Sequence, residues 1–191
     1  MAGTRWRPPV SAGNAALVAV DGINGAAVTA TARAVLLATA RPRRGGASVW
    51  DASGIFEELA VAADEAGAPS ARTLLLLYAA DLAFRLRWEI RPALAEDRVV
   101  VAAPYLDSAI AFGRAAGLRR GWLTDLFRFA PRPTERRYVD APPAQVVARR
   151  HGFVEFGCER LVGAPNGLTR QQLLNRARAQ LQAAASRAGR S

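Results

Sequence analysis

The stretch "VAVDGINGAAVTATARAVLL" (residues 18–37) joins an apolar run to a glycine-containing turn, and an alanine-rich segment follows the turn. The apolar residues predict a strand at 16–21, and the alanine-rich segment predicts a helix at about 28–40. A phosphate-binding loop begins in the same way, with a strand, a glycine turn and the amino end of a helix.

The turn matches the sequence pattern of such a loop only in part. The pattern G-x-x-x-x-G-K-[ST] would require glycine at 22 and 27, lysine at 28 and a hydroxyl at 29. Gly22 and Thr29 fit the pattern, whereas Ala27 and Val28 do not. The loop therefore has backbone amides and a hydroxyl for a weak anion, but it has no cationic side chain.

Further strands and helices alternate along the rest of the chain. The Val-rich run at 98–105 is continuous, as in a parallel strand that is covered on both faces. Thr169 and Gln172 have the spacing of a capping box at the start of the final helix. We also expect strands at 47–50, 136–143 and 159–165 and helices at about 54–66 and 72–94. The alternation predicts an α/β fold, a parallel sheet flanked by helices on both faces.

The long helix expected at 72–94 is apolar on more than one side. Phe84 and Trp88 lie opposite a larger apolar set formed by Leu75, Leu82, Leu86 and Ile90. One side should pack on the sheet, and the other then requires a partner. We therefore expect a homodimer with Phe84 and Trp88 in its interface.

Composition excludes several kinds of site. The 191 residues carry a net charge of +10, and all 26 basic residues are arginine, because the sequence contains no lysine. An arginine-biased genome explains this, and so does a polyanion-binding surface. Cys158 and His151 are the single cysteine and the single histidine, so we expect no disulfide framework, no metal centre and no catalytic triad.

The chain is expected to be one domain at 15–185, with a flexible arm at 1–14 and a disordered tail at 186–191. The arm lacks an apolar signal segment, and the longest apolar runs are too short to span a bilayer. We therefore expect a cytoplasmic protein with no membrane association.

The chain from about 16 to 184 resembles the thymidylate kinases, which belong to the P-loop nucleoside monophosphate kinase group. The clearest match is "LLLLYAADLAFRLRWEIRPAL" (74–94), where the family reads L-L-F-A-A-D-R-x-x-H-x-x-x-x-I-x-P-A-L. The family segment D-R-Y-x-x-S-x-x-A-Y aligns with residues 103–112. Its P-D-x-x-x-x-L-D-x-P-P segment aligns with 133–143, ending in "YVDAPP". The resemblance implies the P-loop fold and a shared ancestry with enzymes that phosphorylate thymidine monophosphate.

The departures from the family concern its charged groups. Val28 replaces the loop lysine, and Leu82 replaces an arginine that faces the nucleotide monophosphate in the family. Ala103 and Pro104 replace an Asp-Arg pair that serves the phosphates and metal. The family's arginine-bearing lid is reduced here to residues 151–158.

The residues that match the family are mostly apolar. By the resemblance, Tyr78 lies where an aromatic ring stacks on thymine, and Phe112 lies near the sugar, although both are equally compatible with ordinary core aromatics. Asn24 holds the acidic position of the loop and can still bond a hydroxyl. We assign no catalytic residue and expect a vestigial nucleotide site formed by Gly22, Asn24, Gly25, Thr29, Tyr78, Tyr105 and Phe112. No cofactor is expected beyond weak binding of ATP and magnesium.

Three functions fit this sequence. The first is an inactive thymidylate-kinase-like protein with an interaction or regulatory role, through a homodimer or another protein partner. The second is an enzyme that retains nucleotide binding and phosphoryl transfer, with arginines in place of the lysine. The third is a nucleic-acid-binding module, because seven arginines between 114 and 137 are interleaved with Trp122, Phe127 and Phe129, and residues 164–191 contain arginines without acids.

Overall fold

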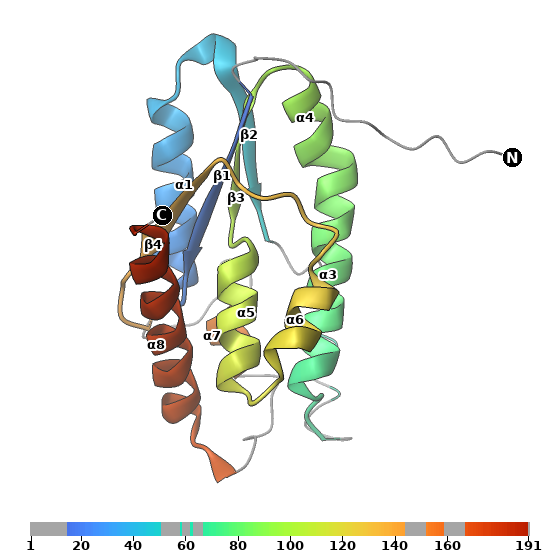
Figure 1. Ribbon diagram of the computed structural model, residues 1–191, viewed down its shortest axis with the longest axis vertical. Coiled ribbons are helices and arrows are strands. Elements are labelled where there is room, and N and C mark those ends of the chain that lie inside the picture. Colours follow the sequence, from blue (N-terminus) through green and yellow to red (C-terminus); the bar gives the residue numbers. More distant parts are fainter. Residues whose placement is uncertain are drawn as a thin grey trace, which may run out of the picture.

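A computed structural model of the chain describes residues 15–50, 58, 62, 67–143, 152–158 and 167–190. Its sheet contains four parallel strands in the order β2-β3-β1-β4 (Figure 1). The strands are β1 (Ala16–Gly22), β2 (Arg44–Val49), β3 (Val99–Ala103) and β4 (Glu135–Val139). Val18 of β1 pairs with Val101 on one side and with Glu135 on the other. The predicted parallel α/β fold is confirmed, and the strand expected at 159–165 lies outside the described residues.

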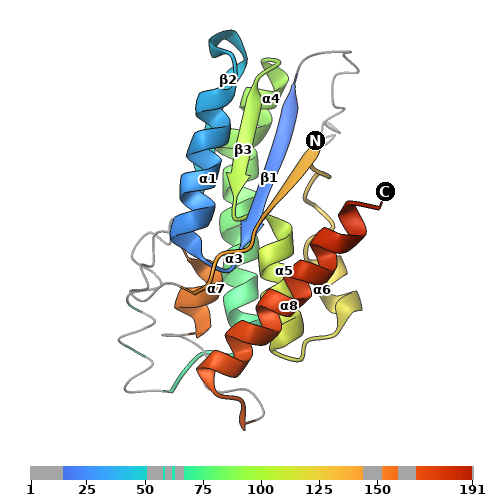
Figure 2. The same cartoon turned by 90° about the vertical axis from the view of Figure 1, so that its left-hand side faces the viewer.

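Helices cover both faces of this sheet (Figures 1 and 2). The helical elements are α1 (Gly25–Ala38), η1 (Arg41–Arg43), α3 (Ala71–Arg85), η2 (Leu86–Ile90), α4 (Arg91–Ala95), α5 (Leu106–Ala115), α6 (Arg120–Leu126), α7 (Phe153–Phe156) and α8 (Arg170–Ala188). The helix expected at 54–66 lies outside the described residues except for positions 58 and 62. The capping box of Thr169 and Gln172 is present, and α8 continues beyond the expected boundary at 185.

The two faces of β1 belong to two apolar clusters, because side chains alternate along a strand. Val18 and Val20 pack with Val28 and Ala32 of α1. Leu17 and Ala19, on the other face of β1, belong to the larger cluster. This cluster also contains side chains of α3, α5, α6, α7 and α8. The side chains of α3, α5 and α8 thus belong to the cluster opposite α1, and Figure 2 shows α1 and α3 on opposite sides of the strands.

The predicted long helix is present as α3, η2 and α4 in uninterrupted succession. The N–H of Arg91 bonds to the carbonyl of Leu86, five residues back, so η2 is a turn of π-helix. Pro92, which has no N–H to donate, follows Arg91 as the second residue of α4. The two expected faces are also present: Leu82 is fully buried, whereas Phe84 and Trp88 are 60% and 64% exposed.

Candidate nucleotide site

The loop after β1 is built around a close approach at Gly22. A Cβ atom at this position would lie 2.7 Å from Cγ2 of Val28 and 2.8 Å from the carbonyl oxygen of Val139. Only glycine fits between these groups. Val28 is 1% exposed and belongs to the cluster between α1 and the sheet. The side chain at the position of the loop lysine is therefore part of the core.

Asn24 holds the amino end of α1. Its Oδ1 accepts a hydrogen bond of 2.9 Å from the N–H of Ala27, which makes it the N-cap of the helix. Its Nδ2 donates to the carbonyl of Pro142 at 2.7 Å. Both polar atoms of this side chain thus bond to the chain itself.

Glu155 supplies an anion to the same helix end. The N–H of Gly25, the first residue of α1, donates a 3.0 Å hydrogen bond to Oε2 of Glu155. Glu155 lies on α7 and is buried. No motif in the sequence points to a role for this residue. Glu155 is the single acid in the apolar run 153–156, which is the one hint that the sequence contains. No spacing rule relates that run to the loop after β1.

Beside the loop, a buried carboxylate joins the ends of β1 and β3. Oδ1 of Asp21 accepts hydrogen bonds from the N–H groups of Tyr105 and Ser108 and from the Ser108 hydroxyl, at 2.8 to 3.0 Å. The Ser108 oxygen also accepts the N–H of Gly22. Burial and, secondly, the charge of Asp107 raise the pKa of Asp21 from 3.8 to about 6.

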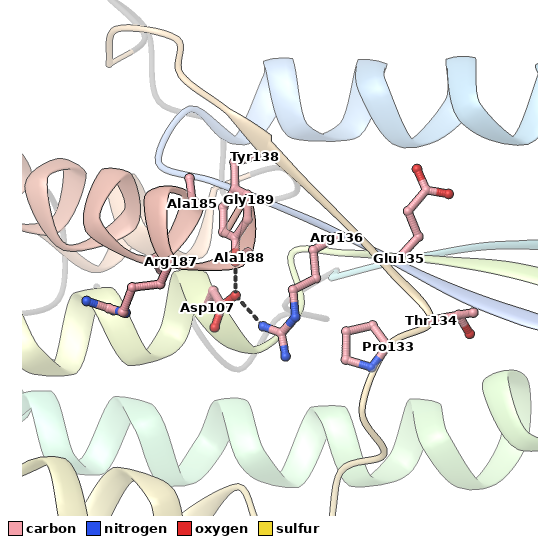
Figure 3. Close-up of a pocket in the computed structure, with 11 residues that line it drawn as sticks. Asp107, Pro133, Thr134, Glu135, Arg136, Tyr138, Ala185, Arg187, Ala188 and Gly189 are labelled. Carbon is pink, nitrogen blue, oxygen red and sulfur yellow. Dashed lines mark hydrogen bonds and ion pairs between the residues drawn. The ribbon is translucent and has the colours of Figure 1, made fainter. Parts of the chain in front are cut away.

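Asp107 faces a cleft between β4 and the end of α8. Its Oδ2 accepts hydrogen bonds of 2.6 Å from Nη1 of Arg136 and from the Tyr138 hydroxyl (Figure 3). The cleft has a volume of about 780 Å³. Burial, followed by the hydrogen bond to Asp107, raises the pKa of Tyr138 to about 12. This cleft lies apart from the candidate nucleotide site and contains none of the residues predicted for it.

The aromatic residues of the candidate site form a closed cluster. Tyr78 and Phe112 are fully buried, and the Tyr78 hydroxyl donates to the carbonyls of Pro104 and Tyr105. The ring of Phe153 from α7 lies 4.5 Å from the Tyr78 ring and 5.4 Å from the Phe112 ring, measured between centroids. The ring surface of Tyr78 that the sequence assigned to a base is therefore in contact with another side chain.

Arg85 is a buried cation that the sequence analysis missed. Its Nε bonds to Oδ2 of Asp81 at 2.8 Å, one helical turn away. In the described part of the chain, Nη1 and Nη2 have no hydrogen-bond partner. The guanidinium carbon lies 5.9 Å from the centroid of the Tyr78 ring, within cation–π range. Arg85 lies three residues after the fully buried Leu82 in α3.

The structure brings most of the predicted residues together. Those at the amino end of α1 are Gly22, Asn24, Gly25 and Thr29, and those in the core beside it are Tyr78, Tyr105 and Phe112. Phe84 and Trp88 lie apart from them, on the exposed side of α3 and η2. Within the described ranges, no cluster of three or more His, Cys, Asp or Glu residues has the arrangement needed to hold a metal ion. None of the helices in these ranges is both long and apolar enough to cross a membrane.

Comparisons with known proteins connect this geometry to one family. No protein-family model matches the chain. A probable thymidylate kinase of Thermococcus gammatolerans is 40% identical over 77 residues, which are 40% of this chain and 37% of that protein. Thymidylate kinase of Symbiobacterium thermophilum is 35% identical over 112 residues, 56% of this chain and 52% of that protein. The matches thus span about a third to a half of the length of these curated relatives.

The fold agrees with this partial sequence similarity. The crystal structure of thymidylate kinase from Ehrlichia chaffeensis superposes with a TM-score of 0.64 at 15% identity, covering 91% of this chain and 83% of that one. The chain is therefore thymidylate-kinase-like in sequence and in fold.

The burial of Asp21 predicts a specific dependence of stability on pH. Folded Asp21 keeps its proton up to about pH 6, whereas in the unfolded chain it ionises near pH 3.8. The folded state therefore binds more protons between these values, and its stability falls as the pH rises from about 4 to about 6. We expect Asp21→Asn to remove a pH dependence of about 3 kcal/mol. Urea unfolding of both proteins from pH 4 to pH 7 measures this difference.

The matched control is Asp125→Asn, which changes an exposed carboxylate on α6. This variant removes an acid of the same type without removing a buried group, so any change that it shares with Asp21→Asn comes from the altered net charge. An Asp21→Asn difference that does not vary with pH would show that folding does not shift the pKa of Asp21.

Proposed function

We propose that this chain is a thymidylate-kinase-like protein that does not transfer phosphoryl groups and acts through a protein–protein interaction. The observation that carries the proposal is Val28, which is buried against Gly22 and the sheet where a P-loop lysine would contact phosphate. The sequence contains no lysine that could substitute for it. Because phosphoryl transfer depends on positioning and on charge stabilisation, this substitution removes a central part of the machinery.

The acceptor side of the site supports the same proposal. Leu82 and Ala103 are fully buried apolar residues at positions where the family has charged groups. Removal of a single preorganised donor typically costs about 10²–10³ in rate. The effects of several losses in one site do not multiply. However, an apolar side chain cannot stabilise the negative charge of the phosphoryl group in the transition state.

The alternative of a nucleotide-binding enzyme rests on Arg85. Its guanidinium is buried next to Tyr78, and in the described residues two of its nitrogens have no hydrogen-bond partner. An arginine in this place provides positive charge close to the expected acceptor. It lies on α3, however, and does not replace the missing charge at the amino end of α1.

The alternative of nucleic-acid binding receives less support. Phe127 is buried, and the ring of Trp122 lies beneath Arg72, whose guanidinium carbon is 5.0 Å from its centroid. One of the three aromatic rings named for this function is thus enclosed and a second has an arginine over one face, whereas Phe129 is 37% exposed and could still stack on a base. The arginines that remain at the surface would give only binding that depends strongly on salt.

A homodimer is the interaction that the surface favours. Leu76, Phe84 and Trp88 are more than half exposed and follow one another at multiples of four residues. The Phe84 and Trp88 rings lie 6.5 Å apart. Leu76 lies about two helical turns before Phe84, and we call these three exposed residues the apolar stripe. We propose that this stripe packs against a second copy of the chain.

The first prediction concerns turnover. Purified protein should not convert thymidine monophosphate to the diphosphate with ATP and magnesium, because the charge at position 28 is absent. A coupled assay for ADP measures this, with an active thymidylate kinase as the positive control. Turnover of even about one per second, at the low end for kinases, contradicts the proposal.

The second prediction concerns repair of the loop. Ala27→Gly with Val28→Lys rebuilds the sequence pattern, but we expect no turnover, because Leu82, Ala103 and Pro104 supply none of the charged groups that the family has at these positions. We also expect a loss of about 3 kcal/mol in the free energy of unfolding, because the ammonium replaces a buried valine. Calorimetry should detect weak ATP binding at most.

The control for this variant is Val28→Ala, which removes the same packing without adding charge. It should destabilise the fold less and should not bind ATP. Steady formation of diphosphate by the repaired loop would show that the site lacked only these two residues.

The third prediction concerns the dimer. Phe84→Glu or Trp88→Glu should convert the protein to a monomer, because burying a carboxylate in an apolar interface is unfavourable. Light scattering and sedimentation give the mass. The matched control is Leu37→Glu, since Leu37 is an equally exposed apolar residue on α1, away from the stripe. A monomeric mass for the unmodified protein at micromolar concentration would contradict the proposed interface.

A further inference from the structure

The amino end of α1 already holds an anion. Gly25 donates its N–H to Glu155 at 3.0 Å, and Glu155 is 2% exposed. The first N–H groups of a helix have no partner within the helix and favour negative charge. In a phosphate-binding loop these groups bind the phosphates of a ligand. Here a carboxylate of the chain is bound in the same way.

The aromatic cluster next to this helix end is also filled from the same segment. The Phe153 ring contacts three aromatic rings: its centroid lies 4.5 Å from that of Tyr78, 5.5 Å from that of Trp50 and 5.4 Å from that of Phe112. Trp50 follows β2, Tyr78 lies on α3 and Phe112 lies on α5, so three separate elements surround one ring. The Tyr78 ring is tilted by 44° to the Phe153 ring, and the Trp50 and Phe112 rings meet it nearly edge-on, so aromatic side chains enclose a planar group on several sides.

One short segment supplies both groups. Phe153 and Glu155 are two residues apart in α7, which lies beside the amino end of α1 at the carboxyl ends of the strands (Figure 2). The neighbouring Val154 and Cys158 are buried as well. An apolar core by itself would account for Phe153, but it gives no reason for a buried carboxylate, which is costly unless it is paired.

We propose that residues 152–158 are a built-in occupant of the candidate nucleotide site, with the Phe153 ring in place of a base and the Glu155 carboxylate in place of a phosphate. The inference rests on the site used in the proposed function, but it concerns occupancy and not chemistry. It implies that the native chain binds neither nucleosides nor phosphate at this site, and that removing the two side chains opens it to both.

Phe153→Ala tests the ring position. Thymidine, which has no phosphate, is the probe, and calorimetry measures its affinity for the native and variant proteins. We expect no saturable binding to the native chain and a gain of about tenfold or more in the variant, because the vacated space has aromatic walls. The matched control is Leu181→Ala, which opens a cavity in the same core on α8 and should bind no thymidine.

Glu155→Gln tests the carboxylate position. The amide keeps the size of the side chain and removes its charge, so inorganic phosphate should raise the melting temperature of this variant more than that of the native protein. The double variant Phe153→Ala/Glu155→Gln should bind thymidine monophosphate more tightly than either single variant does.

Phe153→Val provides the test if Phe153→Ala does not fold, because it keeps some apolar contacts while vacating most of the space of the ring. It should bind thymidine more tightly than the native chain. Saturable binding of thymidine to the native chain at the affinity of the variants overturns the inference, and so do variants that fold without gaining affinity. Turnover by the native chain would instead contradict the proposed loss of activity, so the two failures are distinguishable.

Discussion

The candidate site depends on the buried carboxylate of Asp21. This group ends β1 and accepts hydrogen bonds from the backbone of Tyr105 and Ser108, which follow β3. Two strands that are neighbours in the sheet are therefore fixed to each other at their carboxyl ends, where the loop and α5 begin. The carboxylate lies in a buried position that raises its pKa, and its hydrogen bonds offset part of that cost.

Other contacts of the site follow from this junction. Ser108 accepts the N–H of Gly22 and so fixes the first residue of the loop. Tyr105, whose N–H bonds to Asp21, also accepts a hydrogen bond from the Tyr78 hydroxyl at its carbonyl oxygen. This bond fixes the Tyr78 ring of α3 at the end of the sheet. With Gly22 held there, Val28 packs directly above it, and the first turn of α1 is part of the core.

Within this frame, polar groups that could bind a ligand are used by the chain itself. Asn24 caps α1 and bonds to Pro142, and Gly25 bonds to Glu155. The Phe153 ring fills the apolar space beside Tyr78. Its burial contributes about 1.5–3 kcal/mol to the free energy of unfolding, and this contribution would be lost if the space were empty. The packing of Phe153 against Tyr78 therefore stabilises this end of the sheet.

The sequence by itself determined the fold class and most of the elements. The continuous Val-rich run at 98–105, the glycine turn after 16–21 and the capping box at Thr169 each predicted a local structure that is present, because periodicity and capping act over a few residues. It also determined that position 28 has no cation and that Phe84 and Trp88 lie on an exposed face. Only the tertiary structure decided that Arg85 is buried, that Asp21 is a shared acceptor and that Phe153 and Glu155 meet Tyr78 and Gly25. These contacts join residues up to 130 positions apart, and no pattern within one segment encodes them, since they arise only when strand ends and helices are packed together.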